Sequence, residues 1–208
     1  MAFDLKSARH WAEELLRQAA GPGAVVIDGT MGNGYDTLWL AELVGETGRV
    51  YAFDIQREAV ERTRARLDEA GLAGRVTLFH AGHEHIPELV PEPVDAAVFN
   101  LGWLPGTDKA LRTRADTTLL AVNAALDKLK QGGLLTVCAY PGHEEGRVER
   151  DALIQWAQSL PPAQYGAMIR AYLNQPNDPP VLFAVKKNLL KKPRQPSSTA
   201  TAEANPPA

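Results

Sequence analysis

The chain has 208 residues and a mass of 22.6 kDa; 45% of its residues are hydrophobic and 23% are charged. This length and balance suit one globular domain with a sizeable core, and they exclude a collagen, a coiled coil and a wholly disordered chain. The sequence contains no apolar run of about 18 residues that could span a membrane, and no signal peptide is recognised at its start. A single cysteine, Cys138, excludes an internal disulfide and favours a reducing compartment, so we expect a cytoplasmic protein without membrane association.

The net charge of −3 is unevenly distributed along the chain. Residues 186–208 hold five basic residues and one acidic residue, a charge of +4, so the first 185 residues carry −7. An acidic body argues against a strongly basic nucleic-acid binder. Residues 191–208 have little to bury, which predicts a disordered tail after a single domain of residues 1–190. The basic start of this tail is typical of a solvated segment, with phosphate contact as the alternative.

Apolar runs and amphipathic segments alternate along the chain, which predicts helices at residues 4–20, 35–44, 57–70, 113–130 and 147–160 and strands at 24–28, 49–54, 76–79, 94–100 and 134–140. The third helix is expected to bury Val60, Leu67 and Ala70. Two further strands, at 166–173 and 181–187, have too short a connection for a helical crossover and should pair antiparallel. The sequence therefore predicts an α/β fold of Rossmann type, with a seven-stranded, mostly parallel sheet, helices on both faces and a C-terminal antiparallel hairpin.

Polar residues stand where the expected strands end, at Asp28, Asp54, Asn100 and Tyr140. In doubly wound sheets, ligands bind at the carboxyl ends of the strands. The glycine-rich turn 29–34 follows the first strand, and its glycines would let the backbone pass close to a ligand. The free N–H groups of the next helix lie directly behind this turn. The pattern indicates a nucleotide-type ligand at this edge of the sheet.

Two features separate this turn from a dinucleotide fingerprint. Thr37 stands where that fingerprint has its third glycine, and Asp28 has no use beside a pyrophosphate. A carboxylate here suits a ligand that carries an ammonium, such as S-adenosylmethionine, and Asp54 would then accept hydrogen bonds from the ribose hydroxyls. A simple turn aspartate with a strand-end cap, and a dinucleotide site, are the alternatives.

The segment from Asn100 to Lys109 follows the fourth strand and would lie beside the same turn. The side-chain oxygen of Asn100, with a backbone carbonyl, can accept hydrogen bonds from an attacking amine and direct its lone pair toward a methyl group. Trp103 could stack on a planar base. An Asx-turn next to a buried tryptophan fits the same residues equally well.

Together these segments resemble one family of class I S-adenosylmethionine-dependent methyltransferases. The resemblance covers roughly residues 5–187 and is carried, in order, by residues 28–37, 53–56, 83–84, 99–109 and 140–143 with Gly146 and Glu149. The family was long described as putative rRNA methylases, and it includes the bacterial enzymes that methylate the aminomethyl group of wobble uridine in tRNA. Trp103 and Thr107 depart from the usual pattern, which has a tyrosine and a nearby glycine there.

The resemblance implies roles for individual residues. Those expected to hold S-adenosylmethionine are Asp28, Thr30, Gly32, Asn33, Gly34, Asp36, Thr37, Asp54, Gln56, His83 and Glu84. Those expected on the acceptor side are Asn100, Leu101, Gly102, Trp103, Lys109 and Tyr140. An ammonium must lose a proton before it attacks, and His143, Asp108 and Glu144 are the candidate bases. His143 is favoured by its pH range, with a cap or a substrate hydrogen bond as its alternative role.

Two further clusters have competing interpretations. His80, His83 and His85 with Glu84 could suggest a metal, but none is expected, because no cysteine joins them and transfer from a sulfonium needs no metal. A group of basic residues follows the fourth and fifth strands: Lys109, Arg112, Arg114, Arg147 and Arg150. They form either a basic rim for a tRNA anticodon stem-loop or solvated helix faces paired with Asp116, Glu149 and Asp151.

The sequence as a whole predicts a methyltransferase that modifies the amine of 5-aminomethyl(-2-thio)uridine at the tRNA wobble position. The alternatives are an rRNA or small-molecule amine substrate, and a noncatalytic binding module on the same fold. The complete set of strand-end residues argues against the noncatalytic module. Monomer and homodimer both stay open.

Overall fold

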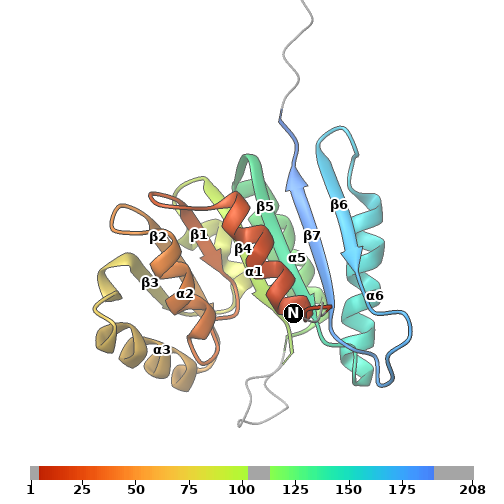
Figure 1. Cartoon of the computed structure of the whole chain (residues 1–208), viewed down its shortest axis with the longest axis horizontal. Helices are drawn as coiled ribbons and strands as arrows, with labels where there is room; N and C mark the ends of the chain where they lie inside the picture. The colour runs from red at the N-terminus through yellow and green to blue at the C-terminus, as the bar shows by residue number, and fades with distance from the viewer. Residues whose placement is uncertain (1–4, 103–112, 190–208) are drawn as a thin grey trace, which may run out of the picture.

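In a computed structural model of the chain, which describes residues 5–102 and 113–189, a seven-stranded sheet runs in the order β3-β2-β1-β4-β5-β7-β6. Five neighbouring strands are parallel, whereas β7 pairs antiparallel with both β5 and β6. Figure 1 shows the sheet between two layers of helices. The strands are β1 (Val25–Asp28), β2 (Arg49–Asp54), β3 (Val76–His80), β4 (Val94–Asn100), β5 (Leu129–Ala139), β6 (Tyr165–Arg170) and β7 (Val181–Lys187). The predicted fold, including the terminal hairpin, is confirmed.

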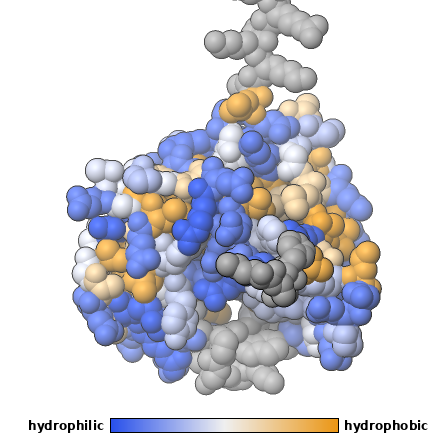
Figure 2. Space-filling model, in the orientation of Figure 1, coloured by the Kyte–Doolittle hydropathy of each residue, from blue (hydrophilic) through white to orange (hydrophobic). Residues whose placement is uncertain are grey.

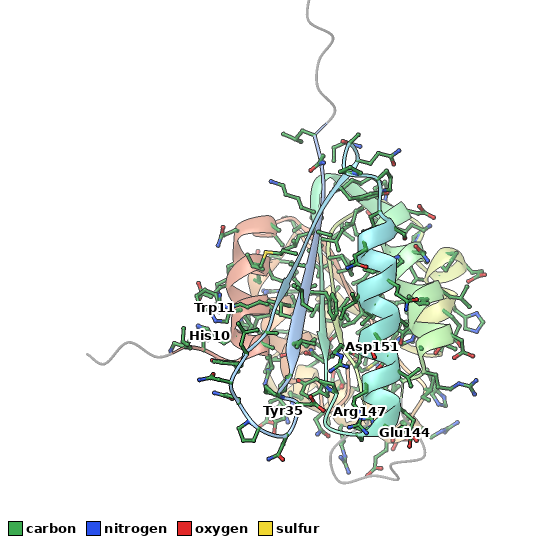
Figure 3. All side chains as sticks on the ribbon, turned by 90° about the vertical axis from the view of Figure 1, so that its right-hand side faces the viewer. His10, Trp11, Tyr35, Glu144, Arg147 and Asp151 are labelled. Carbon is green, nitrogen blue, oxygen red and sulfur yellow. The ribbon has the colours of Figure 1, made fainter. Side chains whose placement is uncertain are left out.

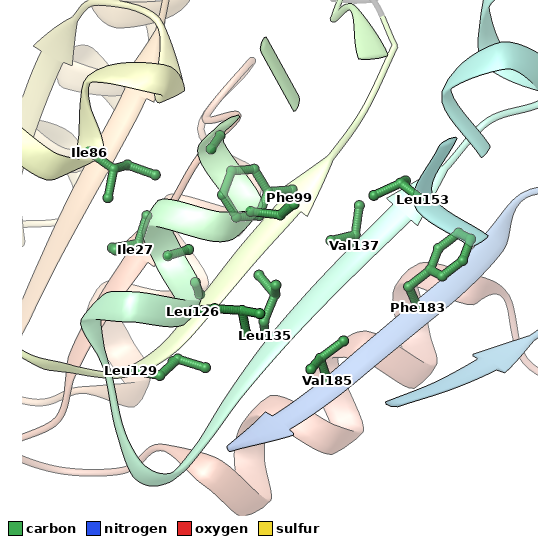
Figure 4. Packing of buried hydrophobic residues seen from close by; sticks show 14 of the residues in the cluster. Ile27, Ile86, Phe99, Leu126, Leu129, Leu135, Val137, Leu153, Phe183 and Val185 are labelled. Atoms are coloured by element: carbon green, nitrogen blue, oxygen red, sulfur yellow. The ribbon is translucent and has the colours of Figure 1, made fainter. Parts of the chain in front are cut away.

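The helices form one layer on each face of the sheet. Helices α1 (Ala8–Ala19), α2 (Tyr35–Leu43) and α3 (Arg57–Glu69) bury Leu16, Leu40 and Leu67 in a common cluster against one face. Helices α4 (Ile86–Leu89), α5 (Ala115–Lys128) and α6 (Glu144–Ser159) cover the other face, where Figure 4 shows Phe99, Leu126 and Leu153 in the second cluster. Short 3-10 turns lie at η1 (Ala73–Arg75) and η2 (His83–His85).

Three details of the sequence prediction are wrong. Helix α1 begins at Ala8 rather than at residue 4, because the Ser7 hydroxyl caps it by accepting a hydrogen bond from the His10 N–H at 3.2 Å. Ala70 is exposed, and the buried face of α3 consists of Ala59, Thr63 and Leu67. The turn and short helix at residues 83–89 were missed, since four helical residues are too few for a periodic signal.

The fifth strand is also longer than predicted. It starts at Leu129, before the Gly132-Gly133 pair, and its pairing with β4 shifts register between Val94 and Ala96. Gly132 has a φ of +84°, which lets the chain continue through the irregularity as a strand. The regular part, from Leu134, places Cys138 opposite Asn100. The ends of β4 and β5 therefore meet at one edge of the sheet.

The edge of the sheet formed by β6 carries exposed hydrophobic side chains. Figure 2 shows hydrophobic colour on the right-hand side, where β6 forms the sheet edge, and Met168 and Ile169 on β6 are about half exposed. Figure 3 shows α1 and α6 on opposite sides of this edge, with Tyr35 and Arg147 near one end of the molecule. No helix within residues 5–102 and 113–189 is long and apolar enough to cross a bilayer.

Close approach between α2 and α3 gives a stability prediction. Gly34 has a φ of +80°, and a Cβ there would lie 2.7 Å from the Thr63 hydroxyl and 2.9 Å from its Cα. Gly71 has a similar φ of +69°, but no atom lies within 4 Å of its Cβ position. We expect Gly71→Ala to cost about 1 kcal/mol of unfolding free energy, and Gly34→Ala about 1–3 kcal/mol more, because only it adds a collision. Urea unfolding measures both, and equal losses would contradict the close packing.

Candidate functional site

A cavity of about 730 Å³ lies at the carboxyl ends of β1, β2 and β4, where the sheet order reverses. Its volume is in the range typical of small-molecule sites. It brings together most of the residues predicted for the site: Thr30, Gly32, Asn33, Asp36, Asp54, Gln56, His83, Glu84, Asn100, Leu101, Gly102 and Tyr140. The strand ends therefore do gather around one cavity.

Asp54 ends β2 on the cavity wall. One carboxylate oxygen accepts the Gly32 N–H at 3.0 Å, and the other accepts the Gln56 N–H at 2.9 Å. Burial raises the pKa of Asp54, and these two hydrogen bonds oppose the rise. Because each carboxylate oxygen has two lone pairs, both can still accept a further hydrogen bond. This geometry fits the two adjacent hydroxyls of a ribose.

Asp28 is not among the residues that line the cavity, and its role as a direct ligand of an ammonium stays a prediction. Its side chain is fully buried, and it accepts hydrogen bonds from the Thr30 N–H at 3.1 Å and the Thr37 hydroxyl at 2.6 Å. Burial, reinforced by the nearby Asp36 charge, raises its pKa to about 7. The carboxyl group therefore stabilises the glycine-rich turn from its buried side.

Thr37 and Gly34, like Asp28, are not among the residues that line the cavity, and their contact with a ligand stays a prediction. Thr37 is fully buried, since its hydroxyl turns inward to Asp28. Gly34 stands at the N-terminus of α2, where it is pressed against Thr63 of α3. Both residues fix the turn that carries Thr30 to Asn33.

The turn after β3 supplies another wall of the cavity. The His83 side chain is buried, and its Nδ1 donates to the Gly29 carbonyl at 3.2 Å. Burial lowers the pKa of His83, which favours the neutral ring. Within the described residues, no group of three or more His, Cys, Asp or Glu side chains is arranged to hold a metal ion.

Asn100 ends β4 and faces the glycine-rich turn. Its backbone N–H donates to the Thr30 hydroxyl at 2.7 Å, and its side-chain Nδ2 donates to Asp36 at 2.7 Å. Its side-chain Oδ1 is buried and has no hydrogen-bond partner among the residues that the structure describes. A buried acceptor without a partner is costly, and a ligand that donates a hydrogen bond would relieve that cost.

Tyr140 lines the same cavity from the end of β5. Burial, together with the neighbouring Cys138 and Asp36, raises the pKa of its phenol to about 12. The hydroxyl therefore keeps its proton at neutral pH. Burial likewise raises the pKa of the Cys138 thiol to about 12, so this cysteine is not a nucleophile.

His143 is not among the residues that line the cavity, and its role as the base stays a prediction. It caps α6, and its Nδ1 accepts the Gly146 N–H at 3.1 Å, which is the cap alternative. Trp103, Asp108, Lys109 and Arg112 lie outside the described residues.

Among the described residues, Glu149 forms no ion pair with an arginine, although the alternative of solvated helix faces includes it as a partner. Glu149 is buried and accepts hydrogen bonds from the Thr118 hydroxyl at 2.6 Å and the Thr113 hydroxyl at 3.0 Å. The Thr113 hydroxyl in turn accepts the Gly102 N–H at 2.8 Å, and the Thr113 N–H donates to the Gly102 carbonyl. This network joins the end of β4 to α5 and α6, and it holds Gly102 on the cavity wall.

Three arginines of the basic group that follows the fourth and fifth strands are described, and each lies near a carboxylate. Arg114 lines the cavity and pairs with Asp116 at 2.9 Å, while Arg150 pairs with Asp151 at 2.8 Å. Arg147 lies 3.7 Å from Asp178. These exposed pairs are weak, so they are compatible with either interpretation of the basic group.

Two residues that line the cavity, Tyr35 and Arg9, have no role predicted from the sequence. Tyr35 is exposed at the cavity, and the Arg66 guanidinium lies 3.9 Å from the centre of its ring. Tyr35 belongs to the segment 28–37 that carries the family resemblance. Arg9 reaches the cavity from α1 and pairs with Asp36. Nothing in the sequence near Arg9 signals this contact, because its partner lies 27 residues away.

A sequence model of the family described as "Putative rRNA methylase" matches residues 50–186. The chain belongs to this family. It is 39% identical over 195 residues to the chloroplastic tRNA (mnm5s2U34)-methyltransferase of Arabidopsis thaliana, which covers 89% of this chain and 71% of that protein.

Solved structures of similar proteins share this fold. The crystal structure of a protein from Clostridium thermocellum described as a putative rRNA methylase superposes with a TM-score of 0.87 at 35% identity, covering 89% of this chain and 100% of that one. A protein from Streptococcus mutans described as a putative methyltransferase, solved in complex with SAH, superposes with a TM-score of 0.81 at 36% identity over 88% of this chain and 99% of that one. The family architecture therefore spans nearly all the described residues.

The buried Asp28 predicts a pH dependence of stability. Its folded pKa of about 7 exceeds its ordinary value of 3.8, so the unfolded chain loses this proton first, and stability should fall as the pH rises from about 4 to 7. Asp28→Asn removes this contribution and keeps an acceptor for Thr30, so we expect it to be more stable than the wild type at pH 8 by about 1–3 kcal/mol.

Urea unfolding of the ligand-free protein at pH 5 and pH 8 measures this difference, and the exposed Asp127→Asn serves as its control. The gain from Asp28→Asn should be larger at pH 8 than at pH 5. A gain that is equal at both pH values would show that Asp28 is ionised throughout.

Proposed function

We propose that this protein transfers a methyl group from S-adenosylmethionine to the amine of 5-aminomethyl(-2-thio)uridine at the wobble position of tRNA. The observation that carries the proposal is Asn100, which lines the same cavity as the glycine-rich turn and Asp54, and whose buried Oδ1 has no hydrogen-bond partner among the described residues. The relative from Arabidopsis, whose name gives this reaction, supports the choice of substrate. The SAH complex of the Streptococcus relative supports the choice of cofactor.

The residues present fit that cofactor. Asp54 and Gln56 would hold the ribose and the adenine side, and the backbone of Thr30 to Asn33 would pass along the methionine portion. His83 and Glu84 would border the adenine. When bound, S-adenosylmethionine supplies a sulfonium methyl that a nucleophile can take.

Asn100 would position the nucleophile. The substrate ammonium first gives up a proton, for which water and the side chains of His143, Asp108 and Glu144 stay the candidate acceptors. The Asn100 Oδ1 then accepts a hydrogen bond from the neutral amine, which directs the nitrogen lone pair toward the methyl group. As the C–N bond forms, the nitrogen becomes positive, and the same oxygen stabilises that charge.

The partner in this proposal is a tRNA anticodon stem-loop, with the protein and tRNA meeting in the cytoplasm. Arg114 at the cavity, together with Arg147 and Arg150 on α6, would contact its phosphates. Trp103, Asp108 and Lys109, on the segment between Gly102 and Thr113, stay predictions for the acceptor side. Residues 191–208 stay a predicted tail, and the proposal holds for a monomer or a homodimer.

The experiment supplies the protein with labelled S-adenosylmethionine and one of three acceptors: tRNA lacking the terminal wobble methyl, rRNA, or free 5-aminomethyluridine. We expect conversion to 5-methylaminomethyluridine in the tRNA alone, read by nucleoside mass spectrometry. Methylation of rRNA or of the free nucleoside at a similar rate would replace the proposed substrate. If labelled cofactor yields no product on any acceptor and SAH does not bind, the methyltransferase proposal fails.

Substitution of Asn100 tests the acceptor site. We expect Asn100→Ala to reduce kcat on the order of 10²–10³-fold, because it removes an acceptor aimed at developing charge, while the Kd for SAH changes less than about threefold. Steady-state kinetics and calorimetry measure the two quantities. Gln155→Ala, on the exposed face of α6, is the matched control. Equal losses in kcat and in SAH affinity would place Asn100 at the cofactor instead.

A further inference from the structure

Three charged or polar side chains from separate elements form a chain of hydrogen bonds beside the cavity. Arg9, on α1, donates from Nε to Asp36 Oδ1 at 2.8 Å, and its Nη2 bonds the same oxygen. Asp36, in the first turn of α2, accepts the Asn100 Nδ2 on its other oxygen, Oδ2, at 2.7 Å. Arg9 thus reaches the end of β4 through a single intervening residue.

The carboxylate decides which way the Asn100 amide faces. An ionised carboxylate accepts hydrogen bonds and donates none, so Asn100 must turn its NH₂ group toward Asp36. The amide is planar, and its Oδ1 is then presented on the side away from Asp36. This is the oxygen that is buried without a partner among the described residues.

Arg9 determines the orientation in which the Asp36 carboxylate bonds to Asn100. The Asp36 side chain is 18% exposed, and its two oxygens are divided between Arg9 and Asn100. Burial lowers the pKa of Arg9, but the charge and hydrogen bond of Asp36 more than offset this and leave the pKa raised. Loss of Arg9 would leave a mostly buried carboxylate with one donor, free to rotate about its side-chain torsions.

We propose that Arg9 and Asp36 are positioning residues, which lock the Asn100 amide in the orientation that offers Oδ1 to the acceptor amine. The proposal rests on the proposed function, in which that amine is the nucleophile. It gives Asp36 a role different from the cofactor contact that the sequence suggested. It also makes α1 part of the site, because the pairing places Arg9 beside Asp36 and Asn100.

The first test compares turnover with binding. Arg9→Met removes the guanidinium at similar length, and we expect kcat to fall on the order of 10–100-fold while KM for tRNA and Kd for SAH change less than about threefold. Arg9→Lys keeps the charge but not the paired donors, so it should recover part of the loss. Arg17→Met, on the same helix and outside the cavity, is the control for charge and helix stability. A loss of SAH affinity that matches the loss of kcat would overturn the proposal.

A double-mutant cycle tests whether Arg9 acts through Asn100. In the Asn100→Ala background there is no amide left to orient, so adding Arg9→Met should change kcat less than about twofold. If the two substitutions multiply their effects instead, Arg9 acts by another route and the proposal is wrong.

A spectroscopic test needs no substrate, so it separates this proposal from the proposed function. The Asn100 side-chain NH₂ signals are assigned in ¹⁵N NMR spectra by their absence from Asn100→Ala. We expect one proton shifted downfield by the carboxylate in the wild type, and loss of that shift in Asp36→Asn and in Arg9→Met. Unchanged signals in both variants would overturn the positioning role, whereas a wild type with ordered Asn100 signals but no tRNA turnover would contradict only the proposed function.

Discussion

The buried Asp28 carboxyl group is the constraint on which the site depends. By accepting the Thr30 N–H and the Thr37 hydroxyl, it bends the chain sharply between β1 and α2. The bent turn then bonds to both neighbouring strands, through the Gly29 N–H to the Val98 carbonyl and the Met31 N–H to the Phe53 carbonyl. A carboxyl group placed where solvent does not reach is expensive, and the two donors and its raised pKa reduce that expense.

The fold could be predicted because its signals are local and repeated. Continuous apolar strands, such as β4, and helices with one apolar face, such as α1, indicate their own type, and their alternation restricts the topology to a doubly wound sheet. Element ends were less predictable, since a cap depends on one side chain. Ser7 starts α1 four residues later than periodicity suggests, and the irregular start of β5 involves Gly132 in a conformation that hydrophobic pattern does not encode.

The location of the site could be predicted from the sequence. Whether each side chain faces the cavity or is buried behind its wall could not. Strand ends gather at one edge in any parallel sheet, so Asp54 and Asn100 were expected to meet. Whether a side chain faces the cavity depends on which partners lie beneath it. The Asp28 carboxyl group bonds to the Thr37 hydroxyl, and the His143 ring accepts the Gly146 N–H. In both cases the side chain bonds to a residue nearby in the sequence and does not face the cavity. Arg9 was missed because its partner lies on another helix.

Four carboxyl groups near the cavity have different structural roles. Asp28 is fully buried and shapes the turn, Asp54 is held by two backbone N–H groups at the wall, and Asp36 pairs with Arg9. Glu149 is buried among hydroxyls and braces the end of β4. Only Asp36 has a cationic side chain as its hydrogen-bond partner among these four, so its charge is balanced before any ligand arrives. A cationic ligand would therefore meet a modest negative potential, set by local pairing and not by the −3 of the whole chain.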